Sequence, residues 1–258
     1  MEHNTPSAND TISSLQGKVA LITGGAHRIG ATTARMLHAE GMNIIVHYRS
    51  SRDAAQALQD ELNARRENSI VLIQADLHET AKITEMVREA SKAWGRLDVV
   101  VNNASSFYPT PVGQIDEKVW DDLIGSNLKA PLFLSQAAAP HLKASHGCIV
   151  NIVDIHADRP LKNHTVYSVA KAGLVMLTKS LARELGPEVR VNAVAPGAIL
   201  WPESEIDDVT KKRIISATTL KRQGEPKDIA RAVRFLIKHA DYMSGQVLTV
   251  DGGRTLTN

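Results

Sequence analysis

Short apolar runs alternate with longer amphipathic stretches along this chain of 258 residues, and this alternation constrains its fold more than any other feature. Such a pattern is typical of a parallel β-sheet with helices packed on both faces. Several runs are apolar almost throughout, which is expected for strands that are buried on both sides. The predicted strands are residues 19–23, 43–48, 69–74, 97–102, 148–153, 189–195 and 246–250.

The stretches between the predicted strands have the period of amphipathic helices. Their expected starting points are Arg28, Asp53, Thr80, Lys118, Thr165 and Pro226. No linker, shift in composition or fixed-period repeat divides residues 17–258, so we expect a single α/β domain. Residues 1–16 are polar and lack the hydrophobic core of a signal peptide, so we interpret them as a flexible N-terminal tail on a cytoplasmic protein.

The composition argues against several classes of protein. The formal net charge is +2 and the short basic run at 211–213 is isolated, unlike the stripe of positive charge that is typical of nucleic-acid binding. No apolar stretch reaches the roughly 18 residues that a membrane span requires. Cys148 is the single cysteine and lies in an apolar run, so we expect a core thiol and no intramolecular disulfide. We therefore expect neither nucleic-acid nor membrane binding.

A metal site is not expected either. Asp154, His156 and Asp158 alternate with the rhythm of a metal-binding loop, but the Gly and Glu that follow in a calcium loop are missing. The ten histidines of the chain do not show the closed spacing of a zinc site.

A glycine-containing turn lies between the first predicted strand and the first predicted helix. Gly24, Arg28, Ile29 and Gly30 lie in this turn. Glycines allow a sharp strand-to-helix turn and let backbone N–H groups approach a phosphate at the positive end of the helix. The sequence favours dinucleotide binding, with a plain tight turn as the alternative. A P-loop is excluded because Ala31 stands where its lysine belongs.

The end of the second predicted strand indicates which nicotinamide cofactor is preferred. Enzymes that use NAD usually place an acid there, which hydrogen-bonds the ribose 2′-hydroxyl. Here the residues are His47, Tyr48, Arg49 and Ser50, without an acid. Arg49 can pair with a 2′-phosphate in bidentate fashion, whereas a carboxylate would repel it. NADPH is therefore favoured, and a solvated loop is the alternative interpretation.

Tyr167 and Lys171 lie four residues apart, on one face of a predicted helix. A nearby cation stabilises a phenolate, so Lys171 is expected to make Tyr167 a better acid at neutral pH. The phenol would then deliver a proton while hydride arrives from the nicotinamide. A tyrosine and a lysine with this spacing more often form a surface pair. Here they indicate a catalytic pair because they lie well downstream of the glycine turn, after a fifth predicted strand.

With these motifs in this order, the chain resembles the short-chain dehydrogenase/reductase family from about Gly17 to its end. The supporting segments are residues 23–30, 76–77, 102–104, 127, 167, 171, 196–197 and 251–253. The resemblance implies a Rossmann-like three-layer α/β sandwich with a seven-stranded parallel sheet. It also implies a homotetramer, with the helices around 118–145 and 165–186 at one interface.

The resemblance assigns roles to further residues. It places Asp76 and Leu77 beside the adenine, Asn103 and Ala104 along the ribose, and Pro196 and Gly197 beside the nicotinamide. Lys171 would hold the nicotinamide ribose, and Asn127 would support a water-linked proton path.

Three departures from the family pattern resemble the pteridine reductases. Arg28 replaces the middle glycine, Asp154 replaces the catalytic serine, and the segment after the fourth strand is extended through residues 102–109. A flat pterin needs an aromatic surface, which Phe107 could supply against the nicotinamide. Ser105, which is also assigned to the cofactor, and Tyr167 could address the polar edge of the pterin.

Arg28 could contact both the pyrophosphate and the substrate. Reduction of a ring C=N bond needs a proton on nitrogen, and Asp154 beside Tyr167 could help supply it. Each residue also has a plainer interpretation: Phe107 as core packing, Asp154 as a loop cap and Arg28 as a cofactor clamp. Trp201 is expected in a segment that covers the substrate, with ordinary packing as the alternative.

We therefore predict NADPH-dependent reduction of a dihydropteridine, with a fully oxidised pterin or a folate as further substrates. The catalytic residues would be Asp154, Tyr167, Lys171 and Asn127. Two alternatives remain: a reductase of ordinary carbonyls, such as a 3-oxoacyl thioester or a sugar ketone, and a regulatory protein that binds NADPH without turnover.

Overall fold

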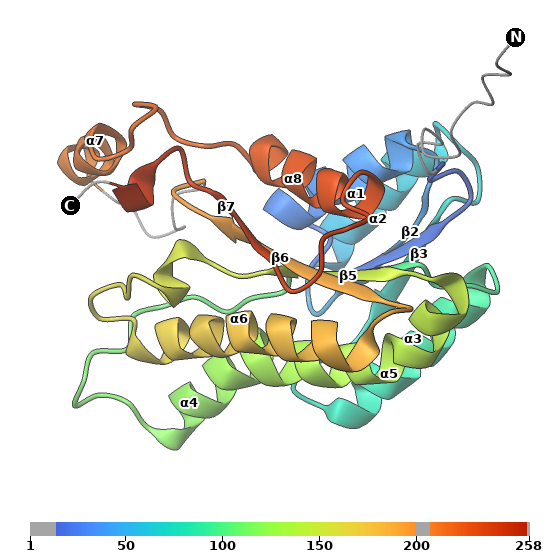
Figure 1. Cartoon of the computed structure of the whole chain (residues 1–258), viewed down its shortest axis with the longest axis horizontal. Helices are drawn as coiled ribbons and strands as arrows, with labels where there is room; N and C mark the ends of the chain where they lie inside the picture. Colours follow the sequence, from blue (N-terminus) through green and yellow to red (C-terminus); the bar gives the residue numbers. More distant parts are fainter. Residues whose placement is uncertain (1–13, 200–206, 257–258) are drawn as a thin grey trace, which may run out of the picture.

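The computed structural model describes residues 14–199 and 207–256, and within them a seven-stranded parallel sheet lies between two layers of helices (Figure 1). The strand order is β3-β2-β1-β4-β5-β6-β7, so the chain changes direction across the sheet between β1 and β4. The strands are β1 (Val19–Ile22), β2 (Asn43–Tyr48), β3 (Ile70–Gln74), β4 (Val99–Asn102), β5 (Cys148–Ile152), β6 (Arg190–Pro196) and β7 (Val247–Val250). All seven predicted strands are confirmed, with ends that shift by two residues at most.

One layer of helices covers each face of the sheet. The first layer is α1 (Arg28–Ala39), α2 (Arg52–Asn63) and α8 (Pro226–Lys238). The second is α3 (Thr80–Ala93), α4 (Glu117–Ile124), α5 (Ala130–Ser145) and α6 (Thr165–Leu185). A further helix, α7 (Asp208–Ser216), lies beyond the end of β6. The predicted helix starts are confirmed to within one residue.

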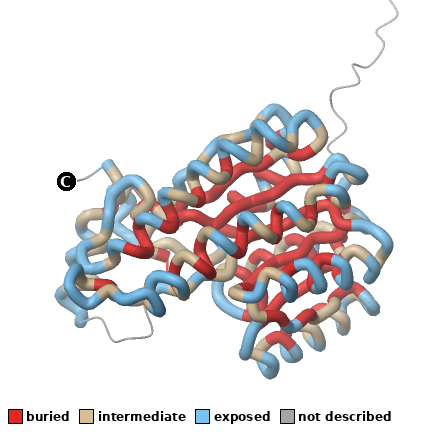
Figure 2. The backbone as a smooth tube through the Cα atoms, turned by 90° about the horizontal axis from the view of Figure 1, so that it is seen from below, coloured by how far each residue is buried: buried red, intermediate tan, exposed pale blue. Residues whose placement is uncertain are grey.

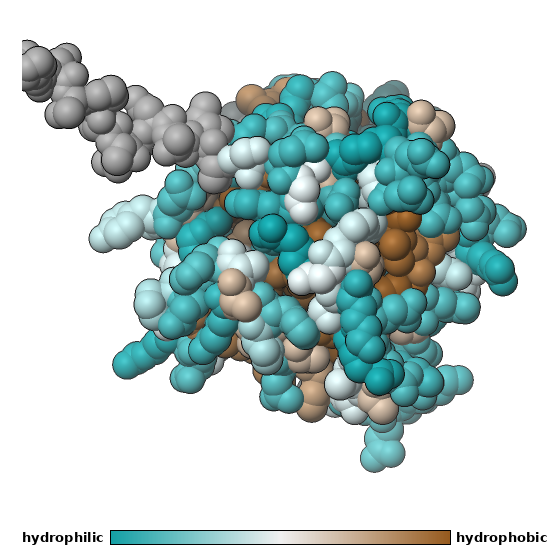
Figure 3. All heavy atoms as spheres, turned by 90° about the vertical axis from the view of Figure 1, so that its right-hand side faces the viewer, coloured by the Kyte–Doolittle hydropathy of each residue, from teal (hydrophilic) through white to brown (hydrophobic). Residues whose placement is uncertain are grey.

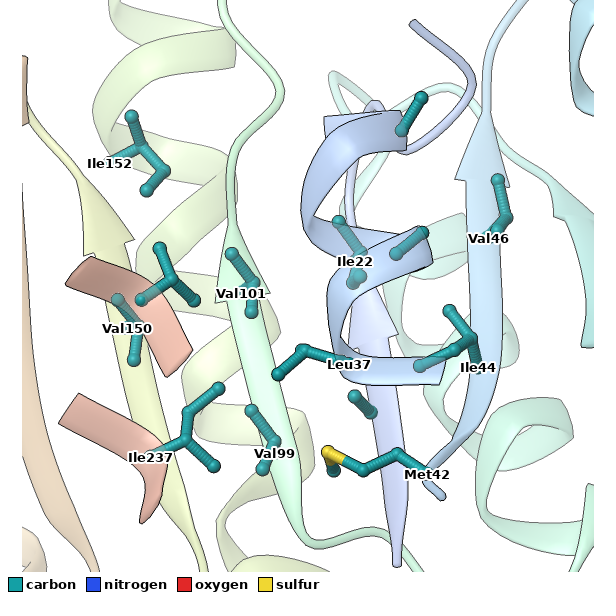
Figure 4. Close-up of a cluster of buried hydrophobic side chains, with 14 of the residues drawn as sticks. Ile22, Leu37, Met42, Ile44, Val46, Val99, Val101, Val150, Ile152 and Ile237 are labelled. Carbon is teal, nitrogen blue, oxygen red and sulfur yellow. The ribbon is translucent and has the colours of Figure 1, made fainter. Parts of the chain in front are cut away.

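The strands divide their side chains between two buried clusters, as the period of two requires. In β1, Ala20 and Ile22 face the α1 and α8 side, whereas Val19 and Leu21 face the α3 and α5 side. Figure 4 shows the first cluster, in which Leu37 of α1 packs over β1, β2 and β4. Burial is concentrated along the sheet and the inner helix faces (Figure 2). This double burial explains the nearly continuous apolar runs of the sequence.

Two features of the helices differ from expectation. The helix expected over 118–145 is interrupted by a π-helical turn, η1 (Gly125–Lys129), between α4 and α5. α7 was not predicted, because it has no buried residue and therefore lacks the apolar period by which a helix is recognised.

The N-terminal tail, predicted over residues 1–16, includes one residue that belongs to the folded domain. Leu15 is 2% exposed and belongs to the larger core cluster, so the folded chain begins before Gln16. Residues 1–13 and Trp201 lie outside the described residues. In the part of the chain that is described, no helix is both long enough and apolar enough to cross a membrane.

The carboxyl ends of all the strands lie at one end of the molecule, the left in Figure 1, where α4 and α6 also begin. The opposite end, where the strands start, presents a largely hydrophilic surface (Figure 3). In sheets of this kind ligands bind beside the carboxyl ends, where the strand order reverses. The fold therefore gathers most of the predicted site residues at one end.

Candidate active site

The turn between β1 and α1 leaves no room for side chains at its glycines. Gly24 has a φ of +58°, which favours glycine. A Cβ added at Gly30 would lie 2.7 Å from the side-chain Nδ2 of Asn103 and 2.9 Å from the Cα of Gly25. Arg28, at the position of the family's middle glycine, keeps the left-handed φ of +50° at a cost of roughly 1 kcal/mol. The Arg28 side chain is exposed, and its backbone is in a strained conformation.

The loop after β4 braces this turn. The Thr23 hydroxyl accepts hydrogen bonds from the backbone N–H groups of Asn103 at 2.9 Å and Ala104 at 3.0 Å. The Asn103 side-chain amide donates to the carbonyls of Thr23 at 2.8 Å and Gly24 at 3.0 Å. Both hydrogen bonds of the Asn103 side-chain amide therefore stabilise the glycine turn, a role that the sequence did not indicate.

His47 supports the turn from beneath and is not placed for the direct cofactor contact that we expected. It is 2% exposed, its Nδ1 accepts from the Gly24 N–H at 3.1 Å, and its Nε2 lies 3.1 Å from the Ala75 carbonyl. Burial lowers the pKa of His47, which keeps the ring neutral with its proton on Nε2. Tyr48 is likewise buried in the core at 8% exposure.

Arg49 and Ser50 follow β2 and are exposed. Arg49, Gln74 and Asp76 line a surface hollow of about 460 Å³ beside α3. Two residues that we assigned to the adenosine end of the cofactor, Arg49 and Asp76, therefore share one hollow.

Four other predicted cofactor residues are less exposed, namely Ile29, Leu77, Pro196 and Gly197. Leu77 is buried at 7%, and Ile29 packs against the core. Pro196 ends β6, and a Cβ at Gly197 would lie 2.6 Å from the Cβ of Asp251, so β6 and β7 approach closely there.

Tyr167 and Asp154 are joined directly. The Tyr167 hydroxyl of α6 donates to Asp154 Oδ2 at 2.8 Å, and Asp154 Oδ1 accepts from the His156 N–H at 2.8 Å. Asp154 thus caps the short 3₁₀ turn Ile155–Ala157 and binds the phenol at the same time. Lys171 is 3% exposed, donates to the Ile152 carbonyl at 2.9 Å and lies 5.5 Å from the centroid of the Tyr167 ring.

The electrostatics of Tyr167 contradict our expectation that Lys171 makes it more acidic. Burial, followed by the negative charge of Asp154, raises the pKa of Tyr167 well above its ordinary value. Burial also lowers the pKa of Lys171 to about 8, although Asp154 partly opposes this shift. The protein alone therefore holds Tyr167 as a neutral phenol.

Asn127 connects the π-helical turn to the loop after β4. Its Oδ1 accepts from the Ser105 hydroxyl at 2.6 Å, and its Nδ2 donates to the carbonyls of Ser106 at 2.9 Å and Leu123 at 3.0 Å. The Ser105 side chain also hydrogen-bonds Tyr167. A continuous polar chain therefore runs from Asp154 through Tyr167 and Ser105 to Asn127.

Phe107 lies beside the phenol. Its ring centroid is 4.8 Å from that of Tyr167 at 80° and 4.7 Å from that of His164 at 16°. Phe107 is 42% exposed, so core packing does not explain it. The stacking of His164 on Phe107 was not predicted from the sequence, because it joins residues far apart in the chain.

Within residues 14–199 and 207–256, no group of three or more His, Cys, Asp or Glu side chains could hold a metal ion. The site offers instead a phenol, a carboxylate, an ammonium and an aromatic face beside a glycine turn.

A family model described as enoyl-(acyl carrier protein) reductase matches residues 24–255. The chain belongs to the short-chain dehydrogenase/reductase family. It is accordingly an oxidoreductase that uses a nicotinamide cofactor.

Curated relatives of this short-chain reductase include proteins with different named activities. Pteridine reductase 1 of Leishmania tarentolae is 36% identical over 279 aligned positions, which cover 93% of this chain and 96% of the relative. A 3-oxoacyl-(acyl-carrier-protein) reductase FabG of Staphylococcus epidermidis is 37% identical over 240 positions, covering 92% and 98%. The FabG of Staphylococcus aureus is 36% identical over 240 positions, covering 92% and 97%. Identity alone does not separate the two activities.

Replacing Thr23 by valine in this short-chain reductase should destabilise the fold. The substitution keeps the side-chain volume but leaves two backbone N–H groups without their acceptor, so the free energy of unfolding should fall by about 1–3 kcal/mol. Urea unfolding measures this. The matched control is Thr32→Val, whose hydroxyl bonds the Arg28 carbonyl at an exposed position; an equal loss in both variants would contradict the bracing role.

Lys171→Met should abolish reductase activity and yet stabilise the fold. The folded pKa of Lys171, about 8, lies below its ordinary 10.5, so a charged Lys171 costs stability below pH 8 and this cost fades as the pH rises toward 10.5. We expect the free energy of unfolding to rise by roughly 1–3 kcal/mol at pH 7. This net gain allows for the lost hydrogen bond from Lys171 to the Ile152 carbonyl, which partly offsets the removal of the buried charge. Denaturant unfolding at several pH values tests this, with Lys179→Met on the exposed side of α6 as control. A gain that persists unchanged above pH 10 would contradict the assignment.

Proposed function

We propose that this protein reduces pteridines with NADPH, converting a dihydropterin to a tetrahydropterin. The observation that carries the proposal is the 2.8 Å hydrogen bond from Tyr167 to Asp154, with Phe107 in edge contact with the same phenol. A proton donor, a carboxylate and an exposed aromatic face thus lie together at the carboxyl end of the sheet.

The residues around the glycine turn fit a dinucleotide. A Cβ at Gly24 would lie 3.0 Å from the Cα of Ala104, so the backbone is bare where a pyrophosphate would approach. The exposed Arg49 at the end of β2 and the absence of an acid there favour a 2′-phosphate. We therefore assign NADPH, held by the turn, by Arg49 and Ser50, and by Lys171 at the ribose.

Reduction of a ring C=N bond adds hydride to carbon and a proton to nitrogen. Bound NADPH supplies the hydride. Tyr167 holds the proton, because its raised pKa keeps the phenol neutral until a basic nitrogen approaches. Asp154 fixes the orientation of the phenol, and the Ser105 hydroxyl, which lies between Tyr167 and Asn127, can turn its proton toward the phenolate that forms. Phe107 offers a stacking face to the flat ring, and Arg28 stands at the mouth of the turn.

Asp154 distinguishes the two candidate substrate classes. A carboxylate beside the reacting atoms stabilises a nitrogen that gains a proton, whereas it disfavours a carbonyl oxygen that gains negative charge. The name of the Leishmania relative supports the pteridine assignment. Reduction of a 3-oxoacyl thioester is the second candidate, because the FabG relatives match this chain at the same level of identity.

We also propose that the protein is a cytoplasmic homotetramer. Trp120 of α4, Leu132 of α5, and Val169 and Met176 of α6 are exposed apolar side chains on the helices that such an assembly would bury.

The test is the rate of NADPH oxidation with dihydrobiopterin, dihydrofolate, biopterin and acetoacetyl-CoA in parallel. We expect saturable turnover with a pterin and none with the thioester. Tyr167→Phe should lower kcat/KM by about 10²–10⁴-fold, because the proton donor is lost. Asp154→Ser should lower turnover of the pterin and allow turnover of the thioester, whereas Asp158→Asn, an exposed acid four residues away, should change neither.

Turnover confined to the thioester in the unmodified protein would contradict the pteridine assignment and favour the second candidate. Binding of NADPH without turnover of any substrate would instead favour a regulatory role.

A further inference from the structure

A second polar chain joins the adenosine side of the site to the loop that carries Phe107. His78, two residues beyond Asp76, places its Nδ1 2.8 Å from Asp76 Oδ1. Its Nε2 lies 3.2 Å from the backbone carbonyl of Asp122 and 3.3 Å from Asp122 Oδ1. The other carboxylate oxygen, Asp122 Oδ2, accepts from the Tyr108 hydroxyl at 2.8 Å. The chain therefore runs Asp76–His78–Asp122–Tyr108.

The π-helical turn makes room for the histidine ring. A Cβ at Gly125, the first residue of that turn, would lie 2.6 Å from Cδ2 of His78. The ring therefore fits only against a glycine at this point. The same turn presents Asn127, which holds Ser105 and Ser106.

Phe107 consequently lies between two anchors that belong to one helical segment. On one side the Ser106 carbonyl accepts from Asn127, and on the other the Tyr108 hydroxyl donates to Asp122. Burial and the neighbouring Asp122 raise the pKa of Tyr108 to about 12, so the phenol stays a hydrogen-bond donor. His78 contacts the other carboxylate oxygen of Asp122, Oδ1.

The polar chain Asp76–His78–Asp122–Tyr108 is poorly suited to a purely structural role. Its members are partly exposed, with side-chain exposures of 28% for His78, 43% for Asp76 and 33% for Asp122. Exposed polar contacts of this kind add little to global stability. Their effect falls instead on the orientation of the segment that they hold, which is the segment that carries Phe107.

We propose that His78 and Tyr108 are positioning residues that set Phe107 for the substrate through Asp122. This inference rests on the proposed function, since it takes the aromatic face of Phe107 as the surface on which the pterin stacks. The inference predicts that breaking this polar chain affects substrate binding more than the chemical step, because Tyr167 and Asp154 do not belong to the polar chain.

The experiment compares Tyr108→Phe, His78→Ala and the double variant with the unmodified protein. Tyr108→Phe removes only the hydroxyl, so the KM for dihydrobiopterin should rise about five- to tenfold while kcat changes less than about twofold. His78→Ala should raise the same KM, and the double variant should raise it no further than the larger single effect, because both break one chain. The control is Tyr242→Phe, a fully exposed tyrosine.

Two further measurements separate positioning from global damage. The urea midpoint should be close to that of the unmodified protein in both single variants. The dissociation constant for NADPH without pterin should be unchanged in Tyr108→Phe, because the Tyr108 hydroxyl bonds Asp122 and not Asp76. An unchanged KM, independent effects in the double variant, or a loss of kcat alone would overturn the positioning role while leaving the proposed function intact. An unmodified protein without activity toward any pterin would overturn both.

Discussion

The hydrogen bond between Tyr167 and Asp154 decides which chemistry this site can perform. It links the start of α6 to the end of β5 and places a negative group on a phenol that is 4% exposed. Removal of the phenolic proton then requires two negative charges to lie together in a buried environment, which is unfavourable. Lys171 offsets this only from a distance, because its ammonium group is bound to the Ile152 carbonyl. The site of the protein alone therefore favours a neutral phenol over a preformed phenolate.

The loop after β4 unites the parts of the site. Asn103 holds the glycine turn, Ser105 contacts Asn127 and Tyr167, and the Phe107 ring is in edge contact with the phenol. A parallel sheet makes this possible, because the carboxyl ends of β1, β4 and β5 are neighbours at one edge. Under the proposed function, a change in this one loop would alter cofactor binding, proton delivery and substrate stacking together.

The features that could be predicted from the sequence are those that depend on the local apolar period and on the order of the motifs. Strands buried on both faces and the glycine turn are of this kind, and so is the placement of Tyr167 and Lys171 on one helix. Prediction from the sequence failed where long-range packing decides the outcome. The buried ring of His47, the raised pKa of Tyr167 and the bond from Tyr108 to Asp122 each depend on neighbours distant in sequence. The interruption at η1 was missed because a single π-helical turn lies inside an otherwise helical stretch.

The most direct test of this account is a titration of Tyr167 by NMR, with tyrosine labelled at the ring carbon that bears the hydroxyl. Tyr167→Phe assigns the signal among the four tyrosines. The account predicts that the pKa of Tyr167 lies well above 10 in the protein without cofactor, and that it falls when Asp154 is replaced by serine. A Tyr167 that titrates below 10 in the unmodified protein, or whose titration is unaffected by the loss of Asp154, would contradict it.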